Sequence, residues 1–369
     1  MMHALSSISR LLLTAGAATG IIASSFSSLS ERELPTFESK CPPFNGTFVI
    51  DQYKLYPENA DFDFKTCLLY IGCLWNATVG IYDPYANEMV DVLEFPEISH
   101  NDNYHIGGVG VDQATGLLSI VVDAAEAFIT GGADVSGTNW IMQWDPVSKS
   151  VLYKLNLTDT AHGKYGGYQD VEQDPEGNVY VVGTYPSSIL KVSNDGKTVT
   201  PWYLSNPPAG STNITGYCGL AAKGWTLLAN DDLGGTPAQI VKFDMREETG
   251  IPIPVPHYPN TTITSSDAIY LPPRYGGTVL LVAEDTEGIS VLRSKDGEWN
   301  WAEYLGRVPN PVPSSYATAV IQVGDGLYVV ALAVGDVSTP GSTSGNRTLF
   351  EFPDITAQVD KLLSVDASY

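Results

Sequence analysis

A strand–turn–strand pattern recurs along the chain, and it limits the possible folds more than any other feature of the sequence. Its clearest copy begins at residues 165–173, turns through the Asp-Pro-Glu-Gly-Asn segment 174–178 and continues in the β-branched run 179–183. Two more short strands are expected at 188–192 and 198–203, separated by another turn. Four short strands joined by tight turns form an antiparallel meander, which is the unit of a β-propeller blade.

Five other segments carry the same pattern, at intervals of about fifty residues, which is a spacing found in propeller repeats. They are residues 64–72, 109–123, 219–230, 268–285 and 319–330. A single copy cannot bury its apolar strands, whereas a closed ring buries them and protects the sheet edges. The sequence therefore predicts an all-β fold, a six-bladed β-propeller of four-stranded antiparallel blades. We expect strands near 47–50 and 348–352 to be neighbours and so to close the ring.

The N-terminal segment predicts entry into the secretory pathway. Arg10 precedes an apolar run, 11–23, that is too short to span a membrane and is followed by small residues. We expect residues 1–24 to be a signal peptide, 25–40 a flexible leader and 41–369 a single propeller domain. No other apolar run is long enough to cross a bilayer.

Sequons and cysteines agree with a secreted glycoprotein. The six Asn-x-Ser/Thr sequons are at Asn45, Asn76, Asn156, Asn213, Asn260 and Asn346. The four cysteines are Cys41, Cys67, Cys73 and Cys218. We expect either a Cys41–Cys67 or a Cys67–Cys73 disulfide, with Cys218 as a buried thiol at the start of a blade.

The charge balance excludes a nucleic-acid partner. The formal net charge is −23, with 19 Lys and Arg against 42 Asp and Glu, so the chain repels phosphates and anionic lipid. Most of this charge is expected to keep the protein soluble. The alternative is that part of it lines a pocket for a cation or a carbocation-like transition state. We expect a monomer whose partner is a small molecule.

Polar and aromatic residues recur where a propeller places its binding site, at one mouth of the central channel. The first residues of the innermost strands meet there, and the ends of the second strands open on the same face. The first group comprises His105, Gln169, Asp170, Tyr217, Asp267 and Tyr316. The second comprises Asp123, Glu126, Tyr185, Asn230, Asp231, Asp232, Glu284, Asp285 and Asp336. Any one of them is more often a turn cap, but the recurrence at one level favours function.

Three kinds of chemistry fit such a mouth. Oxygen ligands from Asp170, Asn230 and Asp267 suit a hard cation such as calcium. A carboxylic acid with a raised pKa can act as general acid opposite a base, and the candidates are His105, His162, Asp123, Glu126 and Asp267. Simple ligand binding can use aromatic faces, which are available from Tyr104, Tyr168, Tyr185, Tyr217, Tyr316 and Trp75. The chain has no Gly-x-Ser-x-Gly, phosphate-loop, dinucleotide or His-Glu-x-x-His motif.

The blade pattern is similar to that of the six-bladed superfamily of gluconolactonases, senescence-marker-like proteins and strictosidine synthases. In its metal-dependent members, acidic and Asn side chains at the starts of innermost strands hold a divalent cation. Residues 266–268, Ser-Asp-Ala, resemble the Asp-bearing start, and Asp170 lies where an Asn-bearing start is expected. A Glu-bearing start in the first blade is not evident. We therefore expect no cofactor, with a calcium-like cation as the alternative.

A second resemblance covers nearly the whole chain. Three segments, Cys-Pro-Pro-Phe-Asn-Gly at 41–46, Asn-Asp-Asn-Tyr-His-Ile-Gly-Gly-Val at 101–109 and Gly-Gly-Tyr-Gln-Asp-Val at 166–171, resemble the core trichothecene cluster protein 14 family of filamentous fungi. That resemblance implies a role in sesquiterpenoid mycotoxin biosynthesis. It also implies a substrate, an oxygenated trichodiene-derived alcohol whose tetrahydropyran ring closes by hydroxyl attack at an allylic position with loss of water.

Such a ring closure needs a general acid, a base and a shaped apolar pocket, but no redox cofactor. We expect Asp267, Asp170 or Glu126 to act as the acid, with His105 as base or orienting group. The expected substrate-binding residues are Tyr104, Tyr168, Tyr185, Tyr217, Tyr316, Asn230, Asp123 and Glu284. Two alternatives remain, a metal-dependent lactonase-like hydrolase and a non-catalytic secreted ligand-binding or virulence protein.

Overall fold

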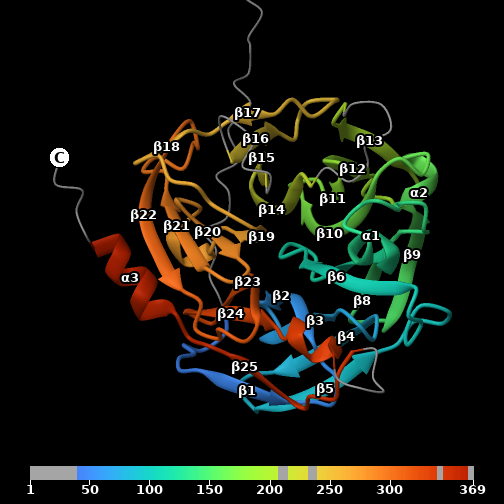
Figure 1. Cartoon of the computed structure of the whole chain (residues 1–369), viewed down its shortest axis with the longest axis horizontal. Helices are drawn as coiled ribbons and strands as arrows, with labels where there is room; N and C mark the ends of the chain where they lie inside the picture. The colour runs from blue at the N-terminus through green and yellow to red at the C-terminus, as the bar shows by residue number, and fades with distance from the viewer. Residues whose placement is uncertain (1–39, 207–214, 232–238, 339–343, 365–369) are drawn as a thin grey trace, which may run out of the picture. The chain divides into compact units, whose positions relative to one another are not determined.

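Antiparallel sheets stand in a ring around a central axis in the unit Phe37–Tyr369 (Figure 1). The computed structural model describes residues 40–206, 215–231, 239–338 and 344–364. The predicted signal peptide, nearly all of the predicted leader, the sequon at Asn213 and the candidate Asp232 lie outside the described residues. The described chain is mainly strand, as the sequence predicts for an all-β propeller.

Five sheets have four strands or more, and each runs outward from an innermost strand. The first contains β2 (Pro57–Asp63), β3 (Leu68–Cys73), β4 (Thr78–Asp83) and β5 (Glu88–Leu93). The second contains β6 (Tyr104–Val111), β7 (Leu118–Ala124), β8 (Trp140–Asp145) and β9 (Ser150–Asn156). The third contains β10 (Gly166–Gln173), β11 (Val179–Tyr185), β12 (Ser188–Val192) and β13 (Val199–Leu204).

The fourth sheet contains β14 (Tyr217–Lys223), β15 (Thr226–Asp231), β16 (Ile240–Asp244) and β17 (Ile253–Pro254). The fifth contains β19 (Ser266–Tyr270), β20 (Val279–Glu284), β21 (Gly288–Arg293) and β22 (Ala302–Pro309). It also has a fifth strand, β18 (His257–Tyr258), which pairs in parallel with β22. The remaining pairs in these five sheets are antiparallel, so the predicted meander is found in each of them.

The prediction of six four-stranded blades is wrong in its count. Between the fifth and the first sheets lie two separate two-stranded sheets. One pairs β23 (Tyr316–Val323) with β24 (Gly326–Leu332), and the other pairs β1 (Phe48–Asp51) with β25 (Leu349–Phe352). They meet through a bridge between Tyr328 and Asp354, just beyond Pro353. Because proline has no N–H to donate, it ends β25 before a continuous ladder with β24 can form.

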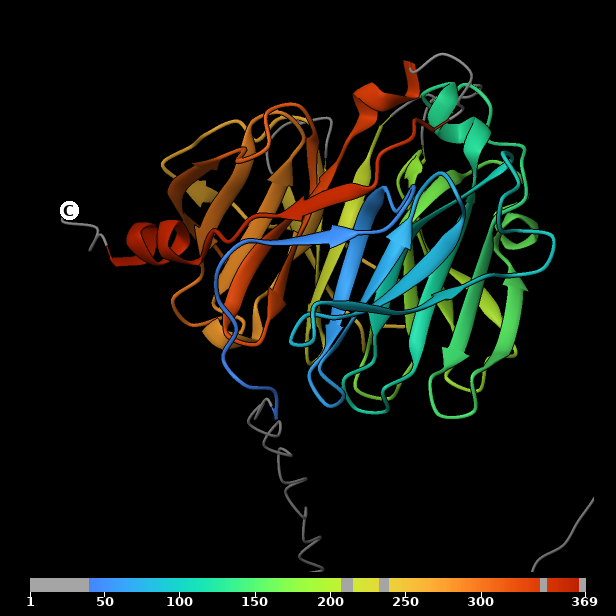
Figure 2. The same cartoon turned by 90° about the horizontal axis from the view of Figure 1, so that it is seen from below.

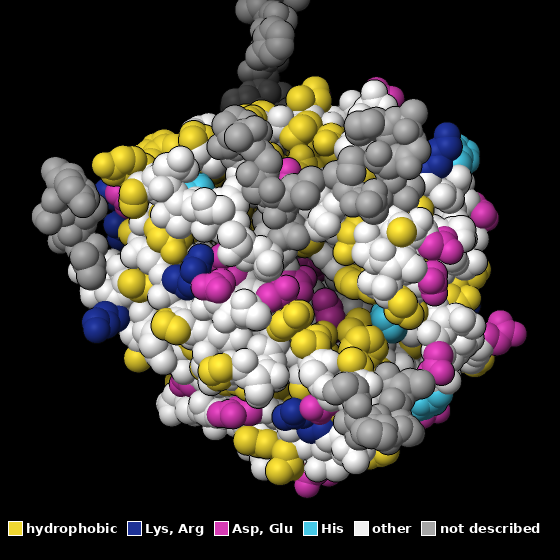
Figure 3. Space-filling view, viewed as in Figure 1, with side chains coloured by type: hydrophobic (Ala, Val, Ile, Leu, Met, Phe, Trp, Pro, Cys, Tyr) yellow, Lys and Arg dark blue, Asp and Glu magenta, His cyan; other side chains and the backbone are white. Residues whose placement is uncertain are grey.

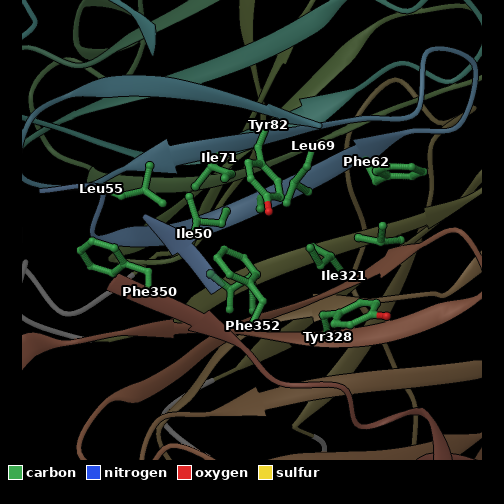
Figure 4. Close-up of a cluster of buried hydrophobic side chains, with 14 of the residues drawn as sticks. Ile50, Leu55, Phe62, Leu69, Ile71, Tyr82, Ile321, Tyr328, Phe350 and Phe352 are labelled. Carbon is green, nitrogen blue, oxygen red and sulfur yellow. The ribbon is translucent and has the colours of Figure 1, made fainter. Parts of the chain in front are cut away.

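Aromatic packing joins the two small sheets to the first blade (Figure 4). The Phe48 ring stacks on Phe352 with centroids 4.9 Å apart and on Tyr82 at 5.7 Å. Tyr328 meets the edge of Phe48 at 5.2 Å. Each such side chain stabilises the fold by about 1.5–3 kcal/mol when it is fully buried. The ring is therefore closed by side-chain packing where it lacks a continuous ladder.

Several short helices connect the strands or pack against them. They are α1 (Ala125–Ile129), α2 (Leu157–Thr160), η1 (Pro273–Tyr275), η2 (Val334–Ser338) and α3 (Thr356–Ser364). Helix α1 follows β7 directly and packs against β10, while α3 packs against β22 and β24 (Figures 1 and 2). Among the described residues, no helix is long and apolar enough to cross a membrane. Of the two pairings that the sequence left open, the structure contains Cys41–Cys67, and Cys73 and Cys218 are buried outside disulfides.

Candidate functional site

The mouth of the channel is assembled as the sequence predicts, because strand starts and strand ends meet there. In each blade the first residues of the innermost strand pair with the last residues of the second strand. The pairs are His105 with Asp123, Gly166 with Tyr185, Tyr217 with Asp231 and Ser266 with Glu284. Figure 3 looks onto one face of the ring, where Asp and Glu side chains gather in a central hollow beside apolar side chains and a histidine.

His105 and Asp123 form a buried pair at this mouth. The two side chains are 6% and 0% exposed, and the distance from His105 Nδ1 to Asp123 Oδ2 is 3.9 Å, too long for a hydrogen bond. Among the described residues, Nδ1 and both carboxyl oxygens of Asp123 have no hydrogen-bond partner. Buried polar atoms in folded proteins are nearly always bonded. The pair is therefore an exception to this rule and a candidate for binding or catalysis.

Burial sets the protonation of this pair. It raises the pKa of Asp123 well above its ordinary value, since a buried charge is poorly solvated. The same desolvation lowers the pKa of His105 to about 4. Burial thus favours the protonated form of the Asp123 carboxyl group and the neutral form of the His105 imidazole. An acid and a base thus stand side by side in the forms that general acid–base chemistry requires.

Glu58 is a third member of the mouth, and the sequence analysis missed it. It lies on β2, is 6% exposed, and its Oε2 has no hydrogen-bond partner in the described chain. Burial, followed by the carboxylates of Asp267 and Asp170, raises its pKa well above the ordinary value. The predicted first blade copy, residues 64–72, covers the β2–β3 turn and most of β3. The innermost strand before it, with its Glu-bearing start, was therefore overlooked.

One wall of the mouth is an aromatic arc, formed by Trp75, His105, Phe128 and Tyr185. The ring centroids of Trp75 and His105 are 5.1 Å apart, those of His105 and Phe128 are 6.1 Å apart, and those of Phe128 and Tyr185 are 6.3 Å apart. The four rings come from the turn after β3, from β6, from α1 and from the end of β11. The indole Nε1 of Trp75 is buried and, in the described chain, lacks a hydrogen-bond partner.

Asp170 is a link between blades. Its Oδ1 accepts hydrogen bonds from Asn59 Nδ2 at 3.1 Å and from the N–H of Val171 at 2.8 Å. Its Oδ2 accepts one from the N–H of Leu220 at 2.8 Å. These contacts tie the first, third and fourth sheets together, and they leave the carboxyl group fully engaged.

Asn230 and Asp267 are linked in a similar way. The side-chain oxygen of Asn230 accepts the N–H of Gly219 at 2.6 Å. Its Nδ2 donates to Ser266 Oγ at 2.9 Å and to the backbone oxygen of Asp267 at 2.7 Å. Two of the three candidate calcium ligands, Asp170 and Asn230, thus already accept hydrogen bonds with their side-chain oxygens. The described residues contain no cluster of three His, Cys, Asp or Glu side chains that could hold a metal ion.

Glu284 is held by an ion pair. Its carboxylate is fully buried and accepts two bonds from Arg307, at 2.9 and 2.7 Å, as well as bonds from the Ser290 hydroxyl and the Thr264 N–H. Arg307 also reaches the exposed Glu287. These contacts indicate that Glu284 stabilises the fifth sheet, and they leave it little capacity to bind substrate.

The other candidates are spread around the mouth. Glu126 is exposed on α1, His162 is exposed in the loop after α2, and Tyr316 is 38% exposed. Tyr104 is half-buried against the second sheet. Tyr168 is fully buried, and Tyr217 stacks on Tyr203 with ring centroids 5.4 Å apart. Of the aromatic candidates, Tyr185 and Trp75 are the ones that the aromatic arc includes.

Further into the channel, a second level of acidic groups links the innermost strands. Asp61, Asp170, Glu172 and Tyr270 line a narrow cavity there. Asp61 accepts the N–H of Val111 at 2.7 Å, which connects β2 with β6. Burial raises the pKa of both Asp61 and Asp170 to about 7.

This level makes the stability of the protein depend on pH. Between about pH 4 and 7 the folded chain keeps protons on Asp61 and Asp170 that the unfolded chain has lost. Their contribution is therefore complete below about pH 4 and is lost as the pH rises through about 7. We expect the free energy of unfolding to fall by up to about 1.4 kcal/mol per pH unit for each group. Urea unfolding between pH 5 and 8 measures this slope.

A substitution at Asp170 can separate this pH dependence of stability from the general repulsion between carboxylates in an acidic protein. Asp170→Asn should flatten the slope, whatever it does to stability at a single pH. Glu88→Gln changes the net charge equally at an exposed position on β5 and should leave the slope unchanged. An equal slope in Asp170→Asn and the parent chain would show that Asp170 does not carry the effect.

The fold defines a class, the β-propeller proteins, and the candidate site lies at one end of the central channel. The description of the family whose model matches residues 39–303 is Mal s 1 allergenic protein-like. The chain belongs to that family. The crystal structure of the major allergen Mala s 1 of Malassezia sympodialis superposes with a TM-score of 0.72 at 20% identity, covering 85% of this chain and 96% of the allergen.

Two relatives confirm the second resemblance stated from the sequence. Trichothecene biosynthesis protein 14 of Trichoderma arundinaceum is 38% identical over 340 residues, which cover 88% of this chain and 92% of that protein. Core trichothecene cluster protein 14 of Fusarium sporotrichioides is 33% identical over 340 residues, with 88% of each chain covered.

Proposed function

We propose that this chain acts in trichothecene biosynthesis, the role that the names of its two fungal relatives state for them. We further propose that its mouth closes the tetrahydropyran ring of an oxygenated trichodiene-derived alcohol with loss of water. One observation carries the chemical part of the proposal. The buried carboxyl group of Asp123 stands 3.9 Å from Nδ1 of His105, and the described chain offers a hydrogen bond neither to that nitrogen nor to the two carboxyl oxygens.

The proposed reaction uses the pair as acid and base. Asp123 donates its proton to the allylic hydroxyl, so the carbon–oxygen bond breaks and water leaves. The second hydroxyl of the substrate forms the new carbon–oxygen bond, and its proton passes to Nδ1 of His105. Transfer of that proton from the imidazolium to the Asp123 carboxylate restores both groups. The atoms balance without an oxidant or a reductant.

Other parts of the mouth would hold the substrate in place. The aromatic arc offers apolar faces to the terpenoid skeleton. Glu58, whose protonated form burial also favours, supplies a second carboxyl group for a substrate oxygen. Water exclusion by the aromatic rings would strengthen each of these hydrogen bonds.

We also propose that the protein works in the secretory route of the cell. A Cys41–Cys67 disulfide persists in oxidising compartments and is rare in the cytosol. Three of the predicted sequons, Asn45, Asn260 and Asn346, have exposed side chains that an attached glycan would not disturb.

The test of the proposed reaction is incubation of the purified protein with a trichodiene-derived triol, with and without a chelator. Chromatography with mass spectrometry follows the tricyclic ether against a reaction without protein. We expect faster and stereochemically cleaner ring closure that the chelator does not change. Loss of activity with the chelator would instead favour a metal-dependent hydrolase. Binding of the triol without any acceleration would favour a non-catalytic binding protein.

A further inference from the structure

Two carboxyl groups meet at the mouth without a Lys or Arg partner among the described residues. Glu58 and Asp123 are each more than nine-tenths buried and have oxygens that lack a hydrogen bond within the described chain. Neither forms an ion pair with any Lys or Arg of the described residues. His105, the basic side chain beside Asp123, is kept neutral by burial, which lowers its pKa to about 4. An external cation would therefore find acceptors here that the described chain leaves unused.

The aromatic arc lies next to these acceptors. In the first blade, Cys73 at the end of β3 pairs with Pro57 at the start of β2. Trp75 follows Cys73 by two residues, and Glu58 follows Pro57 directly. On the other side, a Cβ added at Gly107 would lie 3.0 Å from Glu58 Oε2, so β6 runs directly beside this carboxyl group. His105, two residues earlier on β6, contacts Trp75. The aromatic rings and the carboxyl groups thus lie on neighbouring parts of the first and second blades.

We propose that the mouth binds hydrophobic organic cations, with a quaternary or tertiary ammonium group between the aromatic arc and the carboxyl groups of Glu58 and Asp123. The faces of aromatic rings attract such cations strongly when water is excluded. The inference extends the proposed function, because loss of an allylic hydroxyl develops positive charge at a carbon in the same place. An ammonium ion is then a stable mimic of the charged reaction centre.

Binding of a permanent cation should expel a proton from the mouth. Glu58 faces Asp123, Asp170, Asp267 and Asp285, and His105 faces Asp123. Burial and the neighbouring carboxylates raise the pKa of Glu58 well above its ordinary value, which favours its protonated form in the absence of a ligand. An ammonium ion favours the ionised carboxylate, so its affinity should tighten as the pH rises, by up to about tenfold per unit for one proton released.

The test compares choline with 3,3-dimethylbutan-1-ol, which has a carbon in place of the nitrogen, by isothermal titration of the purified protein. We expect choline to bind at least about tenfold more tightly than its neutral isostere. Trp75→Leu should remove most of that preference, whereas Trp75→Phe keeps a ring face and should retain much of it. Glu58→Gln should weaken choline binding and reduce its pH dependence. Glu88→Gln, on the outer strand of the same blade, should change neither.

Equal affinities for the two probes, or a preference that survives Trp75→Leu, would overturn the proposal. Thermal melting of each variant identifies those that fail to fold. If a variant does not fold, the ratio of choline affinity to isostere affinity in the parent protein tests the proposal by itself. No turnover occurs in this assay, so the two proposals fail independently. A preference for choline without ring closure of the triol would contradict the proposed cyclase reaction and support the cation site. Ring closure without a preference for choline would support the cyclase reaction and contradict the cation site.

Discussion

Replacing Asp123 by Asn should slow ring closure by about a hundredfold or more, with little change in KM. The substitution keeps the size of the side chain but removes the proton that the leaving hydroxyl needs, and general acid catalysis contributes about 10²–10⁴-fold. Steady-state kinetics on the triol measures the loss. The pH–rate profile adds a second readout, because activity should fall below about pH 4, where His105 becomes protonated and ceases to be a base. The fall at high pH, where Asp123 ionises, should disappear in Asp123→Asn.

His105→Gln supplies the complementary variant. It should lose activity by a similar factor and also lose the acid limb of the profile. Glu88→Gln serves as the matched charge control and should keep both the rate and the profile. A kcat in Asp123→Asn within threefold of the parent value would contradict the acid role of Asp123.

Removing the guanidinium of Arg307 should destabilise the protein by about 3–5 kcal/mol, because it strands a buried carboxylate. Glu284 is fully buried and receives two bonds from Arg307, which the Arg307→Leu variant cannot supply. Urea unfolding of the parent and variant proteins gives the difference in free energy of unfolding.

Two controls make this prediction specific. Arg246→Leu breaks an exposed pair with Asp244 and should cost less than about 1 kcal/mol. Adding Glu284→Leu to Arg307→Leu should recover part of the lost stability, since no charge is then left buried. A loss in Arg307→Leu no larger than that in Arg246→Leu would show that solvent reaches Glu284 after the substitution.

The architecture could be predicted because each blade repeats a local pattern. Alternating apolar strands and tight turns, as in residues 165–192, specify a meander without reference to the rest of the chain. The two small sheets that stand in place of a sixth blade could not be predicted in the same way, because their strands come from both ends of the described chain. Whether β24 and β25 form one ladder depends on where Pro353 falls in their mutual register, which no local pattern encodes.

The sequence could place the candidate residues in the fold, but it could not show how most of them are bonded. The topology of a propeller places the starts of innermost strands and the ends of second strands at one mouth. His105 and Asp123 could therefore be assigned to that mouth from their positions in the repeat. The roles of Asp170 and Glu284 depend on partners such as Leu220 and Arg307, which lie far away in the sequence. A carboxyl group looks the same in a sequence whether three donors hold it or none does.

The pairing of β1 with β25 has a consequence for how the protein is made. A ribosome releases Phe352 about three hundred residues after Phe48, although the two are direct partners. The side of the first blade that packs on β1 and β25 therefore stays exposed until β25 has been synthesised. A nascent chain that has not yet reached β25 can therefore contain five folded blades and still expose the unpaired edge of β1 to chaperones and proteases.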